Sequence, residues 1–142
     1  MRIKNSIECW IYNVVQNGFL LLKCPVTPKH GIYWQPVTGG VEPSESHEDA
    51  CIREVREETG IEILSADLMT VAPFFQVEIP ENDLDLRKRI FLVFVESDTV
   101  SLSDEHLGFQ WVRPELVSRF LLWDSNRRSF GIVMDFFMKN RN

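Results

Sequence analysis

The stretch that decides the fold runs from residue 39 to residue 61 and reads GGVEPSESHEDACIREVREETGI. Its middle predicts a helix over 45–59. Ser44 or Ser46 can cap the start of this helix, and acidic residues in the first turn complement the helix dipole. Gly60 suits the position after the last turn, where the backbone often becomes left-handed. The other expected elements lie before and after this helix.

Three glutamates gather on one side of the predicted helix. At 100° per residue, Glu54, Glu57 and Glu58 fall within an arc of about 100°. The adjoining arc is apolar and is expected to face the core, with Cys51, Ile52 and Val55. Like charges three or four residues apart cost roughly a few tenths of a kcal/mol per pair. Hard cations such as Mg²⁺ or Mn²⁺ prefer carboxylate oxygens and would remove this repulsion. The alternative is a solvated acidic face, partly compensated by nearby arginines.

The negative charge of the chain is concentrated in this segment. The 142 residues carry 15 Lys and Arg against 21 Asp and Glu, a formal net charge of −6, of which −4 lies within 45–58. This balance argues against binding to nucleic acid or to a membrane surface through bulk charge. No apolar run approaches the ~18 residues of a membrane span. We therefore expect one domain over 1–142, without nucleic-acid or membrane partners, and cytoplasmic because its three cysteines lack disulfide or CxxC spacing.

Strands are expected on both sides of the predicted helix. Runs of β-branched and aromatic residues predict strands at 7–15, 19–23, 89–96 and 109–112, with strand-like pieces within 61–76. Asn17 and Gly18 predict a hairpin turn, and the polar stretch 78–88 is expected to be a loop. Apolar residues at 130, 133, 134 and 137 predict a second helix over 126–139. This order of elements favours one α/β domain with a mixed sheet.

The deciding stretch resembles the Nudix box, Gx5Ex7REUxEExGU, in which U is a bulky aliphatic residue. Every fixed position is present: Gly39, Glu45, Arg53, Glu54, Val55, Glu57, Glu58, Gly60 and Ile61. The resemblance implies the Nudix fold, an α/β/α sandwich with a mixed sheet, over essentially the whole chain. It also implies an enzyme that uses a divalent cation to hydrolyse a phosphoanhydride bond in a small-molecule substrate.

The resemblance also implies roles for residues of the box. Glu54 and Glu58 are implied as the main ligands of Mg²⁺, with Mn²⁺ as an alternative ion. Glu57 is implied as a further ligand or as a support for the ligands, oriented by Arg53. Glu45 lies about 180° from Glu54 on the helical wheel, so we expect a structural role for it, such as pairing with Arg53.

Residues outside the helix complete the implied site. The backbone carbonyl near Thr38 and Gly39 is implied as another metal ligand, and Gly39 permits a tight turn toward the metal. The run DEHL at 104–107 resembles a segment of dihydroneopterin triphosphate pyrophosphatases, in which the glutamate binds metal. Glu105 is therefore implied as a ligand or base, and the alternative is an ordinary acidic residue of a surface loop. His106 is expected to make a structural hydrogen bond.

Two further stretches resemble the same group of enzymes, YWQPVTG at 33–39 and WDSNR at 123–127, the second with one residue more. Arginines follow an early strand in those enzymes, whereas this chain offers one lysine there. Candidates for contact with a substrate are Lys23, Trp34, Thr38, Arg2 and Lys4. Aromatic candidates for stacking on a base are Trp34, Phe74, Phe75 and Trp123, with Trp34 preferred because it lies just before the box.

The expected activity is Mg²⁺-dependent hydrolysis of a nucleoside or pterin triphosphate, such as dihydroneopterin triphosphate, to a monophosphate and pyrophosphate. One alternative is a house-cleaning hydrolase of oxidised or non-standard nucleotides, or of dinucleotides such as diadenosine polyphosphates or ADP-ribose. A catalytically silent domain that senses a nucleotide is the alternative from another class, and the complete set of box glutamates disfavours it. A homodimer is left open.

Overall fold

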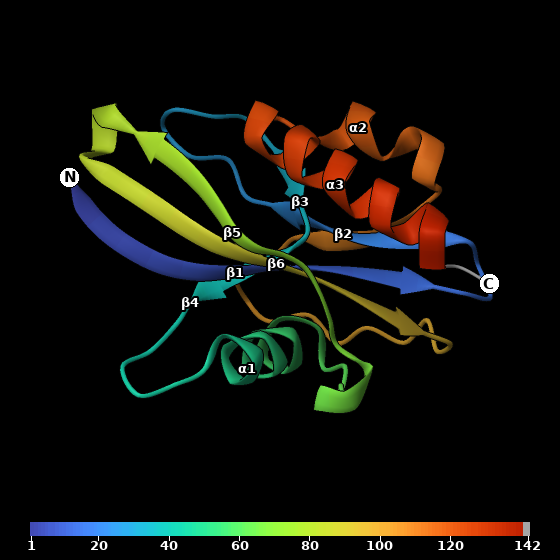
Figure 1. Ribbon diagram of the computed structural model, residues 1–142. Helices are drawn as coiled ribbons and strands as arrows, with labels where there is room; N and C mark the ends of the chain where they lie inside the picture. Colours follow the sequence, from blue (N-terminus) through green and yellow to red (C-terminus); the bar gives the residue numbers. More distant parts are fainter. Residues whose placement is uncertain (141–142) are drawn as a thin grey trace.

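The computed structural model describes residues 1–140 and has three layers (Figure 1). A seven-stranded mixed sheet forms the middle layer. Helix α1 (His47–Thr59) covers one face, and α2 (Val117–Phe120) and α3 (Asp124–Asn140) lie on the other. The predicted α/β sandwich with a mixed sheet is confirmed. The predicted domain 1–142 extends two residues beyond the described part. No helix within residues 1–140 is long and apolar enough to cross a membrane.

Two long parallel strands form the centre of the sheet. The strands are β1 (Arg2–Asn13), β2 (Gly18–Cys24), β3 (Tyr33–Gln35), β4 (Val37–Gly40), β5 (Met69–Ile79), β6 (Leu84–Val95) and β7 (Gly108–Val112). β1 and β6 are parallel along their whole length, and every other pairing is antiparallel: β6 with β5, β1 with β2 and β4, and β2 with β3 and β7. A parallel pair needs a crossover, which here contains α1.

Side chains of β1 alternate between two apolar clusters because successive residues of a strand face opposite sides. Trp10 and Tyr12 belong to the cluster beneath α3. Cys9 and Ile11 belong to the cluster beneath α1. The predicted core faces of both helices are confirmed, with Cys51 and Val55 of α1 and Phe130, Val133 and Phe137 of α3 all buried. Because its apolar side packs on the sheet, α1 turns Glu54 and Glu57 away from the core.

Both ends of α1 are capped as the sequence indicates. Ser46 is the cap at the start, and its hydroxyl accepts a hydrogen bond from the backbone N–H of Asp49 at 3.0 Å. Gly60 closes the end with a left-handed backbone at φ 74°. The helix begins two residues later than predicted because Glu45 still belongs to a turn, in which its N–H donates to the carbonyl of Glu42.

The expectation of a loop over 78–88 is wrong. β5 continues to Ile79, a single 3-10 turn (Pro80–Asn82) follows, and β6 begins at Leu84. The polar side chains in this hairpin pair across the strands and along them, as in the bond from Gln76 Nε2 to Asp85 Oδ1 at 2.8 Å. Their polarity is thus satisfied within the sheet, which the composition of the stretch alone does not reveal.

Candidate functional site

A cavity of about 480 Å³ opens beside the glutamate side of α1. Five carboxylate residues contribute to its lining, together with one serine and two residues of β4: Glu54, Glu57, Glu58, Asp104, Glu105, Ser103, Thr38 and Gly39. The glutamates of the box come from α1, and the acidic residues after Ser103 come from the loop that leads into β7. The structure thus brings every metal ligand named from the sequence to one carboxylate cavity.

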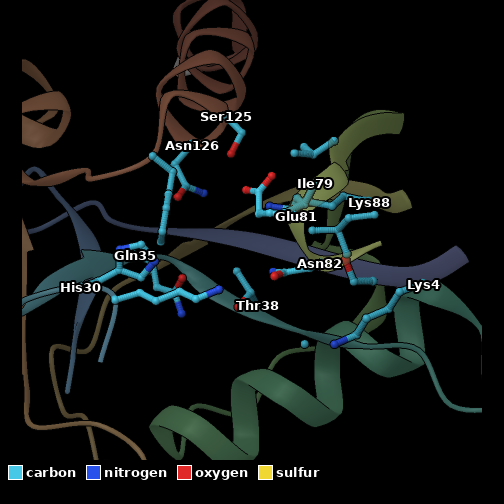
Figure 2. Close-up of a pocket in the computed structure, with 16 residues that line it drawn as sticks. Lys4, His30, Gln35, Thr38, Ile79, Glu81, Asn82, Lys88, Ser125 and Asn126 are labelled. Carbon is cyan, nitrogen blue, oxygen red and sulfur yellow. The ribbon is translucent and has the colours of Figure 1, made fainter. Parts of the chain in front are cut away.

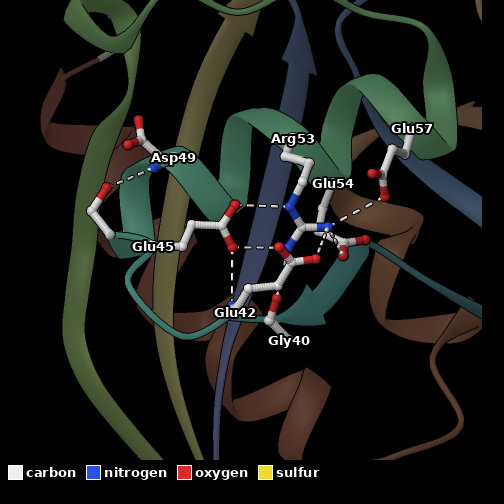
Figure 3. A network of polar contacts seen from close by, with 8 residues as sticks. Gly40, Glu42, Glu45, Asp49, Arg53, Glu54 and Glu57 are labelled. Atoms are coloured by element: carbon white, nitrogen blue, oxygen red, sulfur yellow. Dashed lines mark hydrogen bonds and ion pairs between the residues drawn. The ribbon is translucent and has the colours of Figure 1, made fainter.

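Arg53 ties together the elements that border this cavity (Figure 3). Its Nε and Nη2 bind the two carboxylate oxygens of Glu45 at 2.8 and 3.0 Å, and Nη2 also donates to the carbonyl of Gly40 at 3.0 Å. Its Nη1 lies 2.8 Å from Glu54 Oε1 and 3.3 Å from Glu57 Oε2. The hydrogen bonds from Arg53 lower the pKa of Glu45 to about 2. One guanidinium therefore links α1, β4 and two of the cavity's carboxylates.

Glu58 is the most buried carboxylate of the cavity. Its side chain is 7% exposed, and Oε2 has no hydrogen-bond partner in the described part of the protein. Burial raises its pKa to about 9, and the nearby negative charges of Glu54, Glu105 and Glu57 act in the same direction. The structure thus concentrates negative charge around a carboxylate that lacks a counter-charge.

His106 lies against this carboxylate. Its Nε2 is 3.5 Å from Glu58 Oε1, and its Nδ1 is buried without a hydrogen-bond partner among residues 1–140. Burial lowers the pKa of His106, which keeps the ring neutral near pH 7. The structural hydrogen bond expected for this side chain is reduced to that long contact with Glu58.

The residues of the carboxylate cavity fit a hard divalent cation. All of its side-chain atoms that can bind a metal are oxygens. Glu58 Oε2 is buried and accepts no hydrogen bond from the described residues. Within the described residues, no three His, Cys, Asp or Glu side chains converge closely enough to hold an ion as they stand. Two of the carboxylates instead turn toward Arg53. Binding of a cation therefore calls for rotation of Glu54 and Glu57 toward Glu58.

A second cavity of about 460 Å³ adjoins the first on the α3 side of the sheet and shares Thr38 and Gly39 with it (Figure 2). Its lining combines cations, amides, apolar residues and one tryptophan: Lys4, Ser6, Lys29, His30, Gln35, Thr38, Gly39, Val77, Ile79, Glu81, Asn82, Leu86, Lys88, Trp123, Ser125 and Asn126. We call it the ring cavity. A molecule that spans both cavities passes over the backbone of β4.

The structure brings only some of the predicted substrate contacts to the ring cavity. Lys4 and Thr38 line it, whereas Lys23, Trp34 and Arg2 do not. Lys23 Nζ lies 5.9 Å from the ring centre of Trp34, which packs edge-on against Phe120. Arg2 donates to the carbonyl of Asn82 instead.

Trp123 is the tryptophan that lines the ring cavity. Its ring centre lies 4.4 Å from that of His30, with the two rings nearly perpendicular. The sequence named Trp123 only as one of four stacking candidates. It did not show that Lys88 and Asn126 lie with Trp123 in the ring cavity. Besides the predicted contacts of Lys4 and Thr38, the resemblance of 123–127 to a family motif pointed to the region.

Exchange of Arg53 for lysine is expected to lower kcat by roughly 10- to 100-fold, the usual cost of losing a group that orients metal ligands. Lysine keeps the charge but cannot form the paired hydrogen bonds to Glu45 together with those to Glu54 and Glu57. Steady-state kinetics and thermal unfolding of Arg53→Lys measure the effect. Arg56→Lys, on the exposed side of the same helix, is the matched control. Equal kcat in both variants would contradict this role for Arg53.

The stability of the metal-free protein is expected to fall as the pH rises from about 7 to 8.5. The folded protein retains a proton on Glu58, whose pKa is about 9, while the unfolded chain has lost it above 4.5. Folding then takes up a proton, so higher pH favours the unfolded state. Near pH 7 the lowered pKa values of His47 and His106 oppose this slope slightly, because the unfolded histidines still hold some protons there. Toward pH 8.5 the raised pKa values of the buried Cys9 and Cys24 act in the same direction as that of Glu58.

Thermal unfolding across this pH range, with a chelator or with Mg²⁺, measures this dependence. The midpoint should decline with pH in the chelator, and Mg²⁺ should lessen the decline because the cation replaces the proton on Glu58. Glu58→Gln, which has no proton to lose, should show a flatter profile. Parallel profiles for the wild type and Glu58→Gln would contradict the assignment.

Comparison with known proteins points to one family. The family profile described as NUDIX domain matches residues 4–133. The nucleoside triphosphatase NudI of Salmonella arizonae is 30% identical over 122 residues, which cover 80% of this chain and 84% of that protein. The same enzyme of Salmonella typhimurium is 27% identical over 128 residues, 84% of this chain and 91% of that protein.

Solved structures share the fold. The MutT protein from Methanosarcina mazei superposes with a TM-score of 0.76 at 26% identity, covering 99% of this chain and 96% of that one. The dihydroneopterin triphosphate pyrophosphohydrolase of E. coli gives a TM-score of 0.75 at 24% identity, covering 92% and 95%. The three-layer arrangement and its mixed sheet are therefore those of known proteins over nearly the whole chain.

Proposed function

Because the chain belongs to the NUDIX domain family and is a Nudix hydrolase, we propose that it cleaves a nucleoside or pterin triphosphate with Mg²⁺, releasing a monophosphate and pyrophosphate. The observation that carries this proposal is the carboxylate cavity, which joins the ring cavity at Thr38 and Gly39. The phosphates lie in the first and the heterocyclic ring in the second. Location in the cytoplasm and formation of a homodimer stay predictions.

The chemistry follows from the residues around the carboxylate cavity. Glu54, Glu57, Glu58, Glu105 and the carbonyl of Gly39 would hold the divalent cation. A bound cation neutralises phosphate charge and lowers the pKa of water, which makes water a competent nucleophile near neutral pH. The acidic protein can then accept an anionic substrate.

The protein's own side chains orient the reaction. Arg53 limits the directions in which Glu54 and Glu57 can turn, because it binds both carboxylates and is itself held by Glu45. Glu105, in a loop that lines the cavity, would accept the proton of the attacking water. Glu58 stays buried behind them and is suited to holding the cation rather than to exchanging protons with solvent.

The relatives favour a nucleoside triphosphate over the other substrates. NudI, at 30% identity, is named a nucleoside triphosphatase. The dihydroneopterin triphosphate enzyme and a C. elegans Ap4A hydrolase, at 24% and 23% identity, support the fold only. A nucleoside triphosphate is therefore our first candidate, with a pterin triphosphate second because the stretches at 33–39 and 123–127 resemble the pterin-type enzymes.

A hydrolysis screen tests the proposal. The panel contains canonical and oxidised nucleoside triphosphates, dihydroneopterin triphosphate, ADP-ribose and diadenosine polyphosphates, each with Mg²⁺ and with a chelator. We expect Mg²⁺-dependent turnover of a triphosphate, with monophosphate and pyrophosphate as products detected by ³¹P NMR. Turnover of only ADP-ribose and diadenosine polyphosphates would overturn the proposed substrate class. The absence of any turnover would favour a nucleotide-sensing domain.

A further inference from the structure

A buried ionic network lies at the floor of the ring cavity and has no part in the chemistry described above. Glu8 of β1 is fully buried beneath α3. Its Oε1 accepts hydrogen bonds from Lys88 Nζ at 2.9 Å and Asn126 Nδ2 at 3.1 Å. Its Oε2 accepts from Trp10 Nε1 at 2.8 Å and from the hydroxyl of Ser129. A buried charge with this many partners is held in one place, and so are the groups bound to it.

Glu8 dictates how Asn126 presents its amide. A carboxylate only accepts hydrogen bonds, so the amide nitrogen of Asn126 must face Glu8 and its Oδ1 must face elsewhere. None of the described side chains or backbone groups donates to this Oδ1. Asn126 is 3% exposed and lines the ring cavity (Figure 2). Its Oδ1 is therefore an oriented acceptor without a protein partner.

Lys88 supplies a donor beside that acceptor. Its ammonium group has three N–H donors, of which Glu8 takes one. Lys88 is 8% exposed and lines the same cavity. Because Lys88 and Asn126 bind the same oxygen of Glu8, their polar ends are neighbours. The floor of the cavity thus offers a fixed donor next to a fixed acceptor.

We propose that Lys88 and Asn126 select heterocycles that carry a lactam edge, a ring C=O next to a ring N–H. Lys88 would donate to the carbonyl oxygen, and Asn126 Oδ1 would accept from the N–H. Guanine, hypoxanthine, uracil, thymine and pterins have this edge. Held in the same orientation, adenine and cytosine would turn an amino group toward Lys88 and an unprotonated nitrogen toward Asn126, which places donor against donor and acceptor against acceptor. The inference rests on the proposed function and narrows its substrate class.

The aromatic and apolar walls of the ring cavity hold the ring without distinguishing one base from another. Trp123 and His30 supply aromatic surface, and Val77, Ile79 and Leu86 supply apolar surface. Stacking on such surfaces tolerates every base because each has a π-face. The buried polar groups of Lys88 and Asn126 must then discriminate between bases, because a complex that leaves them without hydrogen-bond partners is less stable.

Matched monophosphates test the inference without any hydrolysis. IMP and AMP differ only at the edge in question, as do UMP and CMP, and none contains a phosphoanhydride bond. Isothermal titration calorimetry with Mg²⁺ should give a Kd at least about tenfold lower for IMP than for AMP and for UMP than for CMP. Equal Kd values within both pairs would overturn the inference. Lactam preference without triphosphate hydrolysis in the screen above would instead overturn only the proposed function.

Variants separate ring recognition from phosphate binding. In Lys88→Met, Glu8 keeps its hydrogen bonds from Trp10, Asn126 and Ser129. The ratio of the Kd for AMP to the Kd for IMP should fall toward one. Arg87→Met removes a neighbouring cation from the opposite face of β6 and should preserve the ratio. Equal weakening of both ligands by Lys88→Met would show a phosphate contact and overturn the inference. The wild-type ligand pairs decide the matter if Lys88→Met fails to fold.

Discussion

Replacement of Glu58 by glutamine is expected to leave the fold intact and to lower kcat roughly 10²- to 10⁴-fold, as loss of a central electrostatic group does. Glutamine has the shape of glutamate and keeps the buried position. It removes one ligand oxygen and the negative charge, and its amide N–H groups repel a cation. The buried Oε2 of Glu58, which has no partner in the described structure, is the atom we expect the metal to need most.

The control for Glu58→Gln is Glu62→Gln. Glu62 follows the same helix but lies exposed beyond Gly60, outside the lining of either cavity. Steady-state kinetics with Mg²⁺ and far-UV circular dichroism are measured for both variants. Glu62→Gln should retain wild-type kcat. Full turnover by a folded Glu58→Gln would contradict the role of Glu58 as a metal ligand.

Replacement of Gly39 by alanine is expected to disable the same site from the other side of the cavity. A methyl group on Gly39 would lie 2.2 Å from Glu54 Cδ and 2.5 Å from its Cγ and Oε2. These distances are impossible, so the Glu54 side chain must leave its place. The strand backbone need not move, because the clash is with a flexible side chain. We expect a loss of roughly 10- to 100-fold in metal affinity or activity and a small change in melting temperature.

The neighbouring glycine provides the matched control for Gly39→Ala. A methyl group on Gly40 would meet only Lys4 Cε, at 3.5 Å, which is an ordinary contact. Gly40→Ala tests the cost of the same added methyl group in the same strand. Metal affinity and kcat should fall far more in Gly39→Ala. Equal losses in the two variants would show that strand flexibility, and not displacement of Glu54, explains the effect.

The box helix was predictable because its signals are local. Ser46, Gly60 and the spacing of Glu54, Glu57 and Glu58 act within a few turns of one another, and the structure confirms the caps and the core face. The hairpin signal at Asn17 is also local, and Asn17 adopts the left-handed backbone with φ 55°. Interactions over short stretches of chain leave a pattern that a single sequence displays.

The features that escaped prediction depend on contacts between distant residues. Glu8 and Lys88 are 80 residues apart, and Asn126 lies 118 residues from Glu8. No periodic pattern in the sequence indicates that Lys88 and Asn126 bind the same carboxylate oxygen of Glu8. Tertiary packing likewise decides which tryptophan lines the ring cavity, because Trp34 packs against Phe120 instead. We expected a loop over 78–88 because the stretch is polar. The sequence does not show that these polar side chains pair along and across β5 and β6.

Titration with Mn²⁺, monitored by electron paramagnetic resonance of the free ion, tests whether the carboxylate cavity binds a divalent metal. We expect the wild-type protein to bind Mn²⁺ and Mg²⁺ to displace it. Glu58→Gln should bind Mn²⁺ at least about tenfold more weakly, in line with the usual cost of disturbing a metal site. Equal Mn²⁺ affinity in the wild type and in Glu58→Gln, or no binding by the wild type, would contradict a metal site in the carboxylate cavity.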